Sequence, residues 1–462
     1  MTSPPASTEA LAPLPLGVEQ LTRGFMAGTL DPVEIIRQCL DRIARQDRSL
    51  KCFITVSTER ALADATASRA RWRSGAPLSA CDGVPIAIKD NVDVTGLPCT
   101  AGTEAFRYRV PAHDALIAHR LREAGTVLLG KLNMHEAALG ATTDNPSYGR
   151  CINPLHPGHT PGGSSGGSGA AVAAGFVSMA IGTDTMGSIR IPAAYCGVFG
   201  FKPGWRYELN SGIVPLHHGF DSPGPIAGSA QDLAQFARLL LGWPGRLNGD
   251  PSAIGRGWTG LRIMRLDEAE SIELDPGIRA GLEAVGRTLS EAGASITRSS
   301  FPAWQPGGAR RAGLLLCEME GHAWWKATLG DELPGLSAGL ASLLRYPLGL
   351  SESRLAQARL TIDALRRAAH EIFARTDLLL LPTAPQTSFP HSEPAPANQA
   401  DLTALANFIG APALAVPIDC DGTAASIQLI AAPGRDDLLL SLAQAIDDIG
   451  QPSPKLPFAR RV

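Results

Sequence analysis

Residues 160–203 read TPGGSSGGSGAAVAAGFVSMAIGTDTMGSIRIPAAYCGVFGFKP, and this stretch decides which fold and chemistry we expect. Its first serine-bearing turn, at residues 162–168, leads into an Ala/Val run and should therefore enter a helix at its N-terminus. Such a turn presents backbone N–H groups and hydroxyls to an anion or an oxyanion. The apolar flanks disfavour a flexible linker, and the lack of a following Gly-Lys-Ser/Thr excludes a P-loop. A plain helix cap and a catalytic loop remain as interpretations.

A second serine-bearing turn, DTMGSIR at residues 184–190, directly follows an apolar strand expected over 177–181. Ser188 has the place of an ordinary helix cap. However, a serine at a strand end, preceded by consecutive backbone N–H groups, is also how a nucleophile and its oxyanion hole are built together. The turn is therefore a candidate catalytic segment.

A serine nucleophile needs a base, and Lys89 is the candidate. None of the ten histidines belongs to a G-x-S-x-G elbow. Lys89 ends the apolar strand PIAIK, where burial of its amine would lower the pKa into a useful range. A solvated lysine at a strand end is the alternative interpretation.

Alternating strands and helices predict an α/β protein with a parallel or mixed sheet. A helix should begin at Asp31-Pro32, where Asp31 can cap and Pro32 fits the first turn. The chain beyond Asp232 is more helical to about residue 375, apart from a strand–helix–strand passage over 261–297. Further helices are expected at 59–74 and 116–124, and strands at 85–89, 126–129, 177–181, 198–201, 378–381, 413–417 and 426–430.

The composition is that of a packed enzyme rich in tight turns. The 49 glycines and 36 prolines make up about 18% of the 462 residues, against a usual share of roughly 12%. Hydrophobic residues at 44% exclude a disordered chain. The net charge of −3 implies no nucleic-acid surface.

We expect a cytoplasmic protein with reduced thiols. The eight cysteines include no C-x-x-C pair, so neither a metal site nor a disulfide framework is expected. The N-terminal residues lack the basic and apolar regions of a secretory signal. The longest apolar stretch, residues 169–182, is too short for the roughly 20 residues that span a bilayer.

Together, several motifs closely resemble the amidase signature family of amidohydrolases. They are GVPIAIKDN (83–91), GKLNMHEAALG (130–140), PGGSSGGSGAAVAAG (161–175), GTDTMGSIRIPAAYCGVFGFKP (182–203), DSPGPI (221–226), DLLLLPTAP (377–385), GAPALAVP (410–417) and SIQLIAAPGRDD (426–437). The resemblance covers most of residues 30–445, and its serine-rich signature is highly specific.

By this resemblance, the fold is a single α/β/α domain around a large, mixed, twisted sheet with helices on both faces. The implied domain spans 18–462, after a disordered or extended tail at 1–17. Its signature core lies at about 80–235, and a helix-rich variable segment at about 240–375.

The resemblance also implies a Ser–cis-Ser–Lys triad without metal or cofactor. Ser188 would be the nucleophile that forms an acyl-enzyme. Ser164, held by a cis peptide, would relay protons between Ser188 and Lys89. Lys89 would first act as the base and then, as the ammonium, return a proton to the leaving amine, which is a poor leaving group until protonated.

Further residues of the two turns take supporting roles by the same resemblance. The backbone N–H groups of Thr185, Met186, Gly187 and Ser188 would form the oxyanion hole, with Ser165, Asp184 and Arg190 as polar supports. The family often has Gly-Gly before the nucleophile, whereas here the pair is Met186-Gly187. We expect the Met186 side chain to affect which substrate sizes are accepted.

The predicted function is hydrolysis of a small linear carboxamide. A hydrolase of urea-derived amides, similar to allophanate or carboxybiuret hydrolases, is an alternative. Another is the A subunit of a tRNA-dependent amidotransferase, although residues 305–375 lack the Tyr-rich segments typical of that protein. The intact triad conflicts with a binding scaffold, and Cys196 lies in an apolar context typical of core. The expected partner is a small amide, with no nucleic acid or membrane, and a homodimer is compatible with the sequence.

Overall fold

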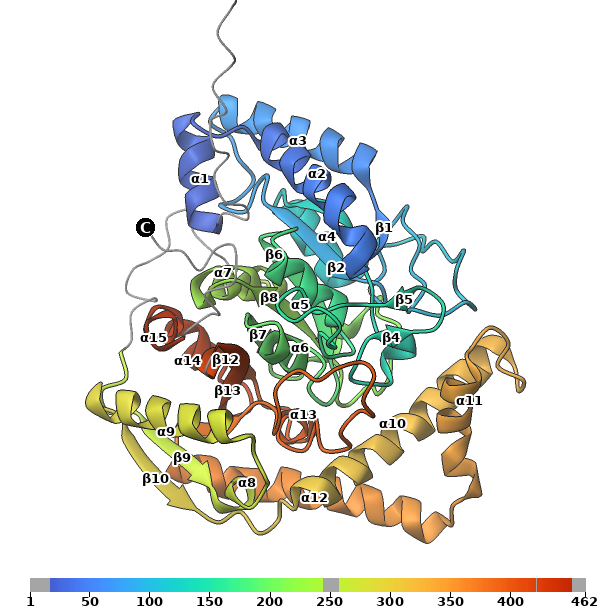
Figure 1. Ribbon diagram of the computed structural model, residues 1–462, viewed down its shortest axis with the longest axis vertical. Coiled ribbons are helices and arrows are strands. Elements are labelled where there is room, and N and C mark those ends of the chain that lie inside the picture. The colour runs from blue at the N-terminus through green and yellow to red at the C-terminus, as the bar shows by residue number, and fades with distance from the viewer. Residues whose placement is uncertain (1–16, 244–256, 421, 451–462) are drawn as a thin grey trace, which may run out of the picture.

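The computed structural model describes residues 17–243, 257–420 and 422–450. Apart from Gly17, the tail predicted at 1–17 lies outside these residues. Within them, one mixed sheet of eleven strands crosses the molecule in the order β1-β3-β2-β6-β8-β7-β12-β13-β11-β9-β10, with helices on both of its sides (Figure 1). The predicted α/β architecture is therefore confirmed.

The strands are β1 (Phe53–Val56), β2 (Pro85–Lys89), β3 (Val127–Leu132), β6 (Met179–Asp184), β7 (Phe199–Lys202), β8 (Ser222–Ala227), β9 (Arg262–Leu266), β10 (Ser295–Ser299), β11 (Leu378–Pro382), β12 (Ala413–Cys420) and β13 (Thr423–Ala431), with a separate hairpin of β4 (Asp144–Asn145) and β5 (Gly149–Arg150). The helices are α1 (Val18–Ala27), α2 (Pro32–Leu50), α3 (Thr58–Arg73), α4 (Leu116–Glu123), α5 (Gly166–Ala173), α6 (Arg190–Tyr195), α7 (Ala230–Leu241), α8 (Asp267–Glu270), α9 (Pro276–Glu291), α10 (Pro306–Leu329), α11 (Ala338–Arg345), α12 (Glu352–Arg375), α13 (Ala404–Phe408), α14 (Asp436–Ser441) and α15 (Ala443–Ile449). Short 3-10 turns lie at η1 (Glu136–Ala138), η2 (Tyr207–Asn210) and η4 (Tyr346–Gly349).

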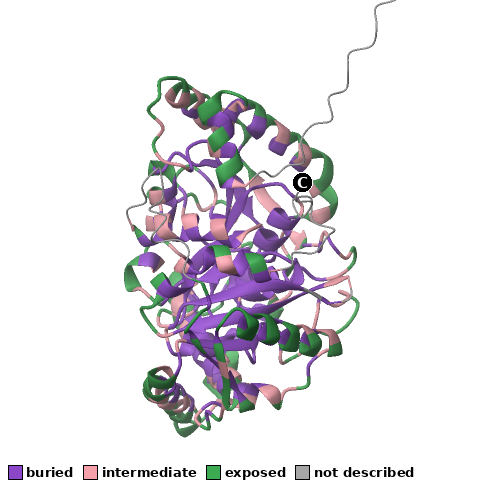
Figure 2. Ribbon diagram, turned by 90° about the vertical axis from the view of Figure 1, so that its left-hand side faces the viewer, coloured by how far each residue is buried: buried purple, intermediate pink, exposed green. Residues whose placement is uncertain are grey.

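The sheet forms the buried centre of the protein (Figure 2). Strands β2, β3, β6 and β8 are buried at every position. Because both faces of these strands are covered, their sequences do not alternate between apolar and polar residues. Helix α5, which follows the first serine-bearing turn, is also buried along its whole length.

The predicted helices and strands are present, with boundaries shifted by a few residues. Asp31 caps α2, accepting a hydrogen bond from the Val33 N–H at 2.8 Å, and Pro32 takes the first helical position as predicted. The strand predicted at 177–181 runs instead over β6 and ends at Asp184, which brings the second turn directly to the strand end.

Sequence reasoning missed β1 and β8. β8 was not predicted because its residues Pro223 and Pro225 argue against a central strand. β8 pairs with β7 only at Phe199–Ala227 and Gly200–Ile226, so both prolines lie beyond the stretch that pairs with β7. The sheet therefore tolerates two prolines in its interior.

The passage predicted at 261–297 forms one edge of the same sheet. β9 and β10 pair in parallel, and β11 joins them to β13. Helix α10 packs against α12 and α11 in the gold and orange part of Figure 1. Trp325 on α10 is buried in the core formed there, and the partly buried Trp324 packs against that core.

All eight cysteines are buried and form no disulfide. Cys196 packs in the core, where burial raises the pKa of its thiol well above the ordinary value. A thiol in such surroundings is unreactive. Across the described residues, no helix has the length and apolar character needed to cross a membrane.

Gly167 provides a test of how closely α5 packs on the sheet. A Cβ at this position would lie 2.3 Å from the Asn133 backbone oxygen and 2.6 Å from that of Cys52. We expect Gly167→Ala to lower the free energy of unfolding by about 1–3 kcal/mol, because backbone cannot easily move aside. Gly286→Ala in α9 is the matched control, since its nearest atom would be 4.0 Å away.

The control should raise stability by about 0.5–1 kcal/mol through helix propensity. Denaturant unfolding followed by circular dichroism measures both variants. Equal stability of the two variants would contradict the close packing described for α5.

Candidate active site

Lys89 ends β2 and lies fully buried beside the end of β6. The two strands run parallel, with Ile88 opposite Ile181, so their carboxyl ends meet at one place in the sheet. There the Lys89 Nζ donates hydrogen bonds to the Ser164 Oγ at 2.7 Å and to the Thr183 Oγ1 at 2.8 Å. The structure thus brings two of the three predicted triad residues into contact.

The burial of Lys89 changes its protonation. Desolvation lowers its pKa to about 7, although the charges of Asp221 and Asp184 act in the opposite direction. A substantial fraction of the amine is therefore neutral at physiological pH and able to accept a proton.

Ser164 is held by the loop that packs on its backbone. The Gly163–Ser164 peptide bond is cis, as the resemblance implies. The Ser164 carbonyl accepts a hydrogen bond from the His135 N–H at 3.0 Å. A Cβ at Gly163 would lie 2.7 Å from the Thr142 nitrogen, so the loop leaves no room for a larger residue. These contacts hold the Ser164 hydroxyl toward Lys89.

Ser188 lies on the second turn, next to the first one. Its carbonyl accepts the Ser165 N–H at 3.2 Å, which joins the two serine-bearing turns directly. The Ser165 hydroxyl donates to the Thr183 carbonyl at 3.1 Å. Ser188 is partly exposed, and its hydroxyl has no hydrogen-bond partner within the described part of the chain. The Ser188 hydroxyl is therefore not held by a hydrogen bond to these residues.

Asp184 and Arg190 form a fully buried ion pair under the second turn, with an Nη2–Oδ1 distance of 3.0 Å. Burial alone would raise the pKa of Asp184, but Arg190 lowers it to about 2. The carboxylate accepts hydrogen bonds from the backbone N–H groups of Gly187 at 2.7 Å and Ile189 at 3.2 Å. The pair therefore fixes the conformation of the turn that carries Ser188.

The hydrogen bond between the Gly187 N–H and Asp184 changes which N–H groups can form the expected oxyanion hole. The Gly187 N–H, predicted to belong to the oxyanion hole, already donates to Asp184. The N–H groups of Thr185, Met186 and Ser188 have no partner among the described residues, so these three remain available to an oxyanion. Gly187 is needed for another reason, because its φ of +129° is unfavourable for other residues and a Cβ would lie 2.2 Å from the Thr403 Oγ1.

Sequence reasoning missed Thr183, Asn91 and Asp221. The Asn91 Nδ2 donates to the Thr183 Oγ1 at 3.2 Å, which supports the second hydroxyl bound to Lys89. Asp221 accepts the Thr185 hydroxyl at 2.5 Å. A polar residue within or beside a buried strand was the available signal, but only the strand register shows which of these residues meet.

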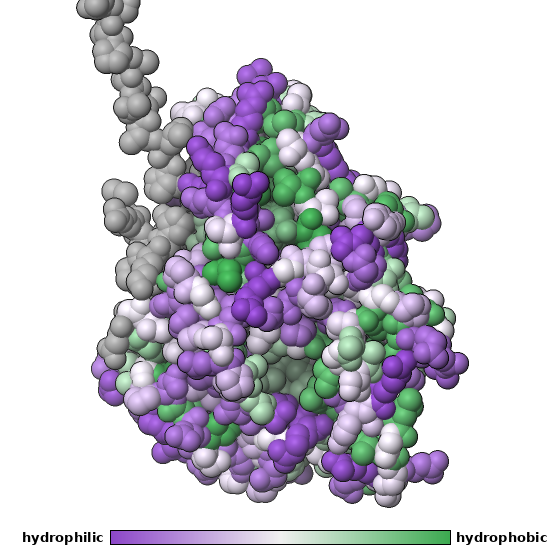
Figure 3. Space-filling view, turned by 45° about the vertical axis from the view of Figure 1, so that its right-hand side comes forward, coloured by the Kyte–Doolittle hydropathy of each residue, from purple (hydrophilic) through white to green (hydrophobic). Residues whose placement is uncertain are grey.

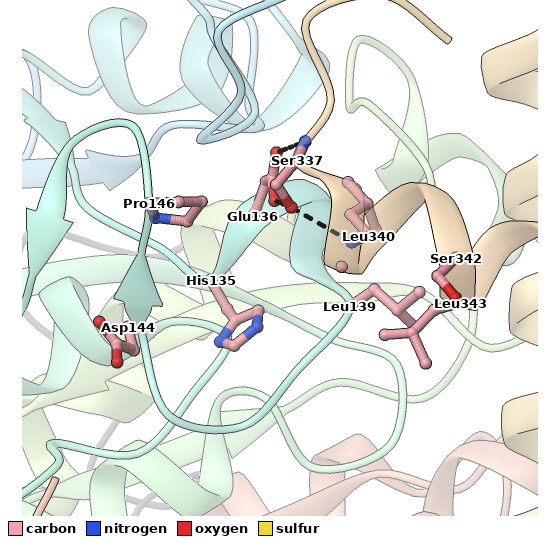
Figure 4. Close-up of a pocket in the computed structure, with 10 residues that line it drawn as sticks. His135, Glu136, Leu139, Asp144, Pro146, Ser337, Leu340, Ser342 and Leu343 are labelled. Atoms are coloured by element: carbon pink, nitrogen blue, oxygen red, sulfur yellow. Dashed lines mark hydrogen bonds between the residues drawn. The ribbon is translucent and has the colours of Figure 1, made fainter. Parts of the chain in front are cut away.

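A cleft of about 630 Å³ lies beside the loop that supports Ser164 (Figure 4). Its walls come from the segment 135–146 on one side and from 337–343, including α11, on the other. Glu136 crosses between the walls, and its carboxylate accepts hydrogen bonds from the Ser337 N–H and hydroxyl. Burial lowers the pKa of His135 to about 4, so this ring is neutral at physiological pH.

A hollow with apolar atoms on its wall is also visible on the face shown in Figure 3. In sequence, the residues lining the cleft of Figure 4 belong partly to the GKLNMHEAALG motif and partly to the variable segment. Residues of the motif thus meet residues of the helical segment close to Ser164.

Comparison with known proteins shows which family has this fold. Residues 34–440 match the family described as Amidase, so the chain belongs to the amidase signature family, whose hydrolases act on amide C–N bonds. The A subunit of the glutamyl-tRNA(Gln) amidotransferase of Chloroflexus aggregans (strain MD-66 / DSM 9485) is 33% identical over 93% of this chain and 95% of its own length.

Solved structures give the same result. One comes from work on an unexpected vestigial protein complex that reveals the evolutionary origins of an s-triazine catabolic enzyme. It aligns with a TM-score of 0.86 at 29% identity, covering 94% of this chain and 99% of its own. The peptide amidase of Stenotrophomonas maltophilia aligns with a TM-score of 0.76 at 27% identity, covering 97% and 99%.

Two buried lysines on adjacent strands allow a test of how Lys89 is held. Lys131 on β3 is also fully buried, but its Nζ lies 2.9 Å from the Asp90 Oδ1. Burial opposes its charge, but Asp90, Cys99 and Asp93 together raise the pKa of Lys131 overall. We expect Lys131→Met to cost about 3–5 kcal/mol of stability, because it leaves Asp90 buried and unpaired.

Lys89→Met should instead stabilise the protein at pH 7, by about 1–4 kcal/mol. The pKa of Lys89 falls from 10.5 to about 7 on folding, so the penalty is complete below pH 7 and disappears as the pH approaches 10.5. The advantage of Lys89→Met should shrink over this interval. Urea unfolding at several pH values measures it, and a loss of stability like that of Lys131→Met would refute the description of Lys89 as an unpaired buried amine.

Proposed function

We propose that the protein hydrolyses a small, neutral, linear carboxamide through an acyl-enzyme on Ser188. The observation that supports this most is the 2.7 Å hydrogen bond between the buried Lys89 Nζ and the Ser164 Oγ. A lysine with a pKa near 7 is poised for proton transfer in both directions at neutral pH.

In the proposed first step, the Ser188 oxygen attacks the carbonyl carbon of the amide. Ser188 passes its proton to Ser164, while Ser164 passes its own proton to the neutral Lys89. The negative charge on the carbonyl oxygen is stabilised by the N–H groups of Thr185, Met186 and Ser188. Removal of one such donor typically costs roughly 2.7–4 kcal/mol of transition-state stabilisation.

The tetrahedral intermediate then collapses with cleavage of the C–N bond. The Lys89 ammonium returns a proton through Ser164 to the leaving nitrogen, which departs as ammonia or an amine. Water attacks the ester at Ser188, and the same relay takes up a proton and returns it to the Ser188 oxygen. The carboxylic acid leaves and the enzyme is regenerated.

The charges around the site support a neutral substrate. The Arg190 guanidinium is occupied by Asp184, the Thr403 carbonyl, Gln428 and Asn407. In the cleft, Glu136 is bound by Ser337, and Asp144 pairs with Arg150. A substrate with its own carboxylate or ammonium group would find no unpaired counter-charge in these residues.

The Met186 side chain adds an apolar wall. It is partly buried and packs against the apolar cluster that includes Phe220 and Trp325. Because Met186 belongs to the proposed oxyanion hole, this wall lies close to the acyl group of a bound substrate. We therefore propose apolar aliphatic or aromatic acyl groups over charged ones.

The A subunit of a tRNA-dependent amidotransferase is the second candidate function. It is favoured by the 33% identity over nearly the whole length of such a protein. In that case the chain would act with partner subunits on an amino-acid amide. Hydrolysis of a urea-derived amide is a further candidate, favoured by the 29% identity to the structure connected with s-triazine catabolism.

Replacement of the nucleophile tests the proposed chemistry. Ser188→Ala should reduce amide hydrolysis by at least about 10³-fold while the protein remains folded, because the acyl-enzyme cannot form. A fluorophosphonate should label the wild-type protein once and should not label the variant. Ser178→Ala is a suitable control, since that serine precedes β6 at the opposite end of the strand. Normal turnover by Ser188→Ala would refute the proposal.

A substrate panel separates the candidate functions. Ammonia release should be fastest for neutral aliphatic or aromatic amides and at least about tenfold slower for glutamine and for carboxylated ureas, since unpaired charges are costly to bury. Preference for glutamine, or activity only with a co-purified partner, would favour the amidotransferase function. Preference for the carboxylated ureas would favour the third candidate.

A further inference from the structure

Asp221 lies at the point where three segments of the site meet. β6 and β8 run antiparallel, with Asp184 opposite Ser222, so the residues just beyond this pair, Thr185 and Asp221, face each other. The Asp221 Oδ1 accepts the Thr185 hydroxyl at 2.5 Å. Its Oδ2 accepts the backbone N–H groups of Leu216 at 2.9 Å and His217 at 3.1 Å.

Resting on the proposed role of Lys89, we propose that Asp221 is a positioning residue with two effects on catalysis. Through Thr185 it fixes the start of the oxyanion turn. Through its negative charge it raises the pH below which Lys89 stops acting as a base. Neither effect requires Asp221 to touch the substrate.

The charged and titratable groups around Asp221 determine the sign of the second effect. The groups that interact with Asp221 or Lys89 are Asp184 at the end of β6, the His217 backbone on the same loop, Glu320 and Cys317 on α10, and His135, which interacts with Lys89. Among them, Asp221 is the charge that most favours the ammonium form of Lys89. Removal of its charge should therefore keep Lys89 neutral at lower pH.

Asp221 is charged over the range in which Lys89 titrates. Burial raises its pKa to about 6, although its hydrogen bonds to Thr185, Leu216 and His217 act in the opposite direction. Above this value Asp221 is mostly ionised, and around pH 7 it opposes deprotonation of the lysine.

Asn is a substitution that removes the charge and can keep the contacts. The amide oxygen of Asp221→Asn can accept the Leu216 and His217 N–H groups, while its NH₂ group can donate to the Thr185 oxygen. Thr185→Val instead removes the hydrogen bond between Thr185 and Asp221 and keeps the carboxylate of Asp221. The pair of variants separates the two proposed effects.

The pH dependence of kcat/KM for an amide substrate tests the proposal. The wild-type acid limb should have its midpoint near the pKa of Lys89, about 7. In Asp221→Asn the midpoint should move down by about 0.5–1 pH unit, so that activity at pH 6, relative to the plateau, rises about two- to fivefold. Thr185→Val should lower kcat by about tenfold or more and should move the midpoint less than Asp221→Asn does, because the carboxylate of Asp221 remains.

Asp232→Asn is the matched control, because Asp232 is also buried and also has a pKa raised to about 6, but it binds the Val18 N–H on α1. Its acid limb should match the wild type. An unchanged limb in Asp221→Asn would overturn the proposal. If that variant does not fold, Asp221→Ser provides a second neutral replacement with the same expected shift.

Failure of the proposed function would look different. In that case the wild-type protein itself would show no acid limb near pH 7, or Lys89→Met would retain activity. Suppose that wild-type kcat/KM falls below about pH 7 and that Lys89→Met is inactive. An unchanged midpoint in Asp221→Asn would then refute only the role of Asp221.

Discussion

The site depends on one buried amine whose nearest partners carry no charge. The Lys89 Nζ is hydrogen-bonded to two hydroxyl groups, those of Ser164 and Thr183, and is fully shielded from water. A protonated amine in such surroundings loses its hydration without gaining a directly bonded carboxylate. The pKa of Lys89 therefore falls to about 7, whereas Lys131 on the next strand pairs with Asp90 and stays charged. The pKa values of these two buried lysines are thus shifted in opposite directions.

The rest of the architecture holds the reacting groups around this amine. Parallel pairing of β2 with β6 brings Lys89 beside Thr183, and antiparallel pairing of β6 with β8 brings Thr185 beside Asp221. The Asp184–Arg190 ion pair fixes the conformation of the turn, because the Asp184 carboxylate accepts a hydrogen bond from the Gly187 N–H. Under the proposed function, this arrangement leaves three N–H groups free for the oxyanion before substrate arrives, so little reorganisation is needed during the reaction.

Sequence reasoning predicted the fold class, most strands and the residues that the structure places together. Lys89 and Ser188 stand out because polar residues follow apolar strands, whereas only the family resemblance distinguishes Ser164 from the other serines of its turn. The roles of Thr183 and Asp221 were not accessible, because they arise from strand register rather than from local pattern. β8 was missed because its prolines contradict strand propensity and are tolerated only where β7 does not pair. The use of the Gly187 N–H by Asp184 is likewise a tertiary contact that spacing alone does not reveal.

In the proposed mechanism, a neutral Lys89 activates Ser188 through Ser164. The most direct test of this activation is the rate of Ser188 modification by a fluorophosphonate as a function of pH, with no amide substrate present, read by mass spectrometry of the intact protein and of its peptides. We predict that the label lies on Ser188 and that its rate rises with pH about a midpoint near the pKa of Lys89, about 7. A rate that is independent of pH between about 5 and 9, or a label on another residue, would contradict it.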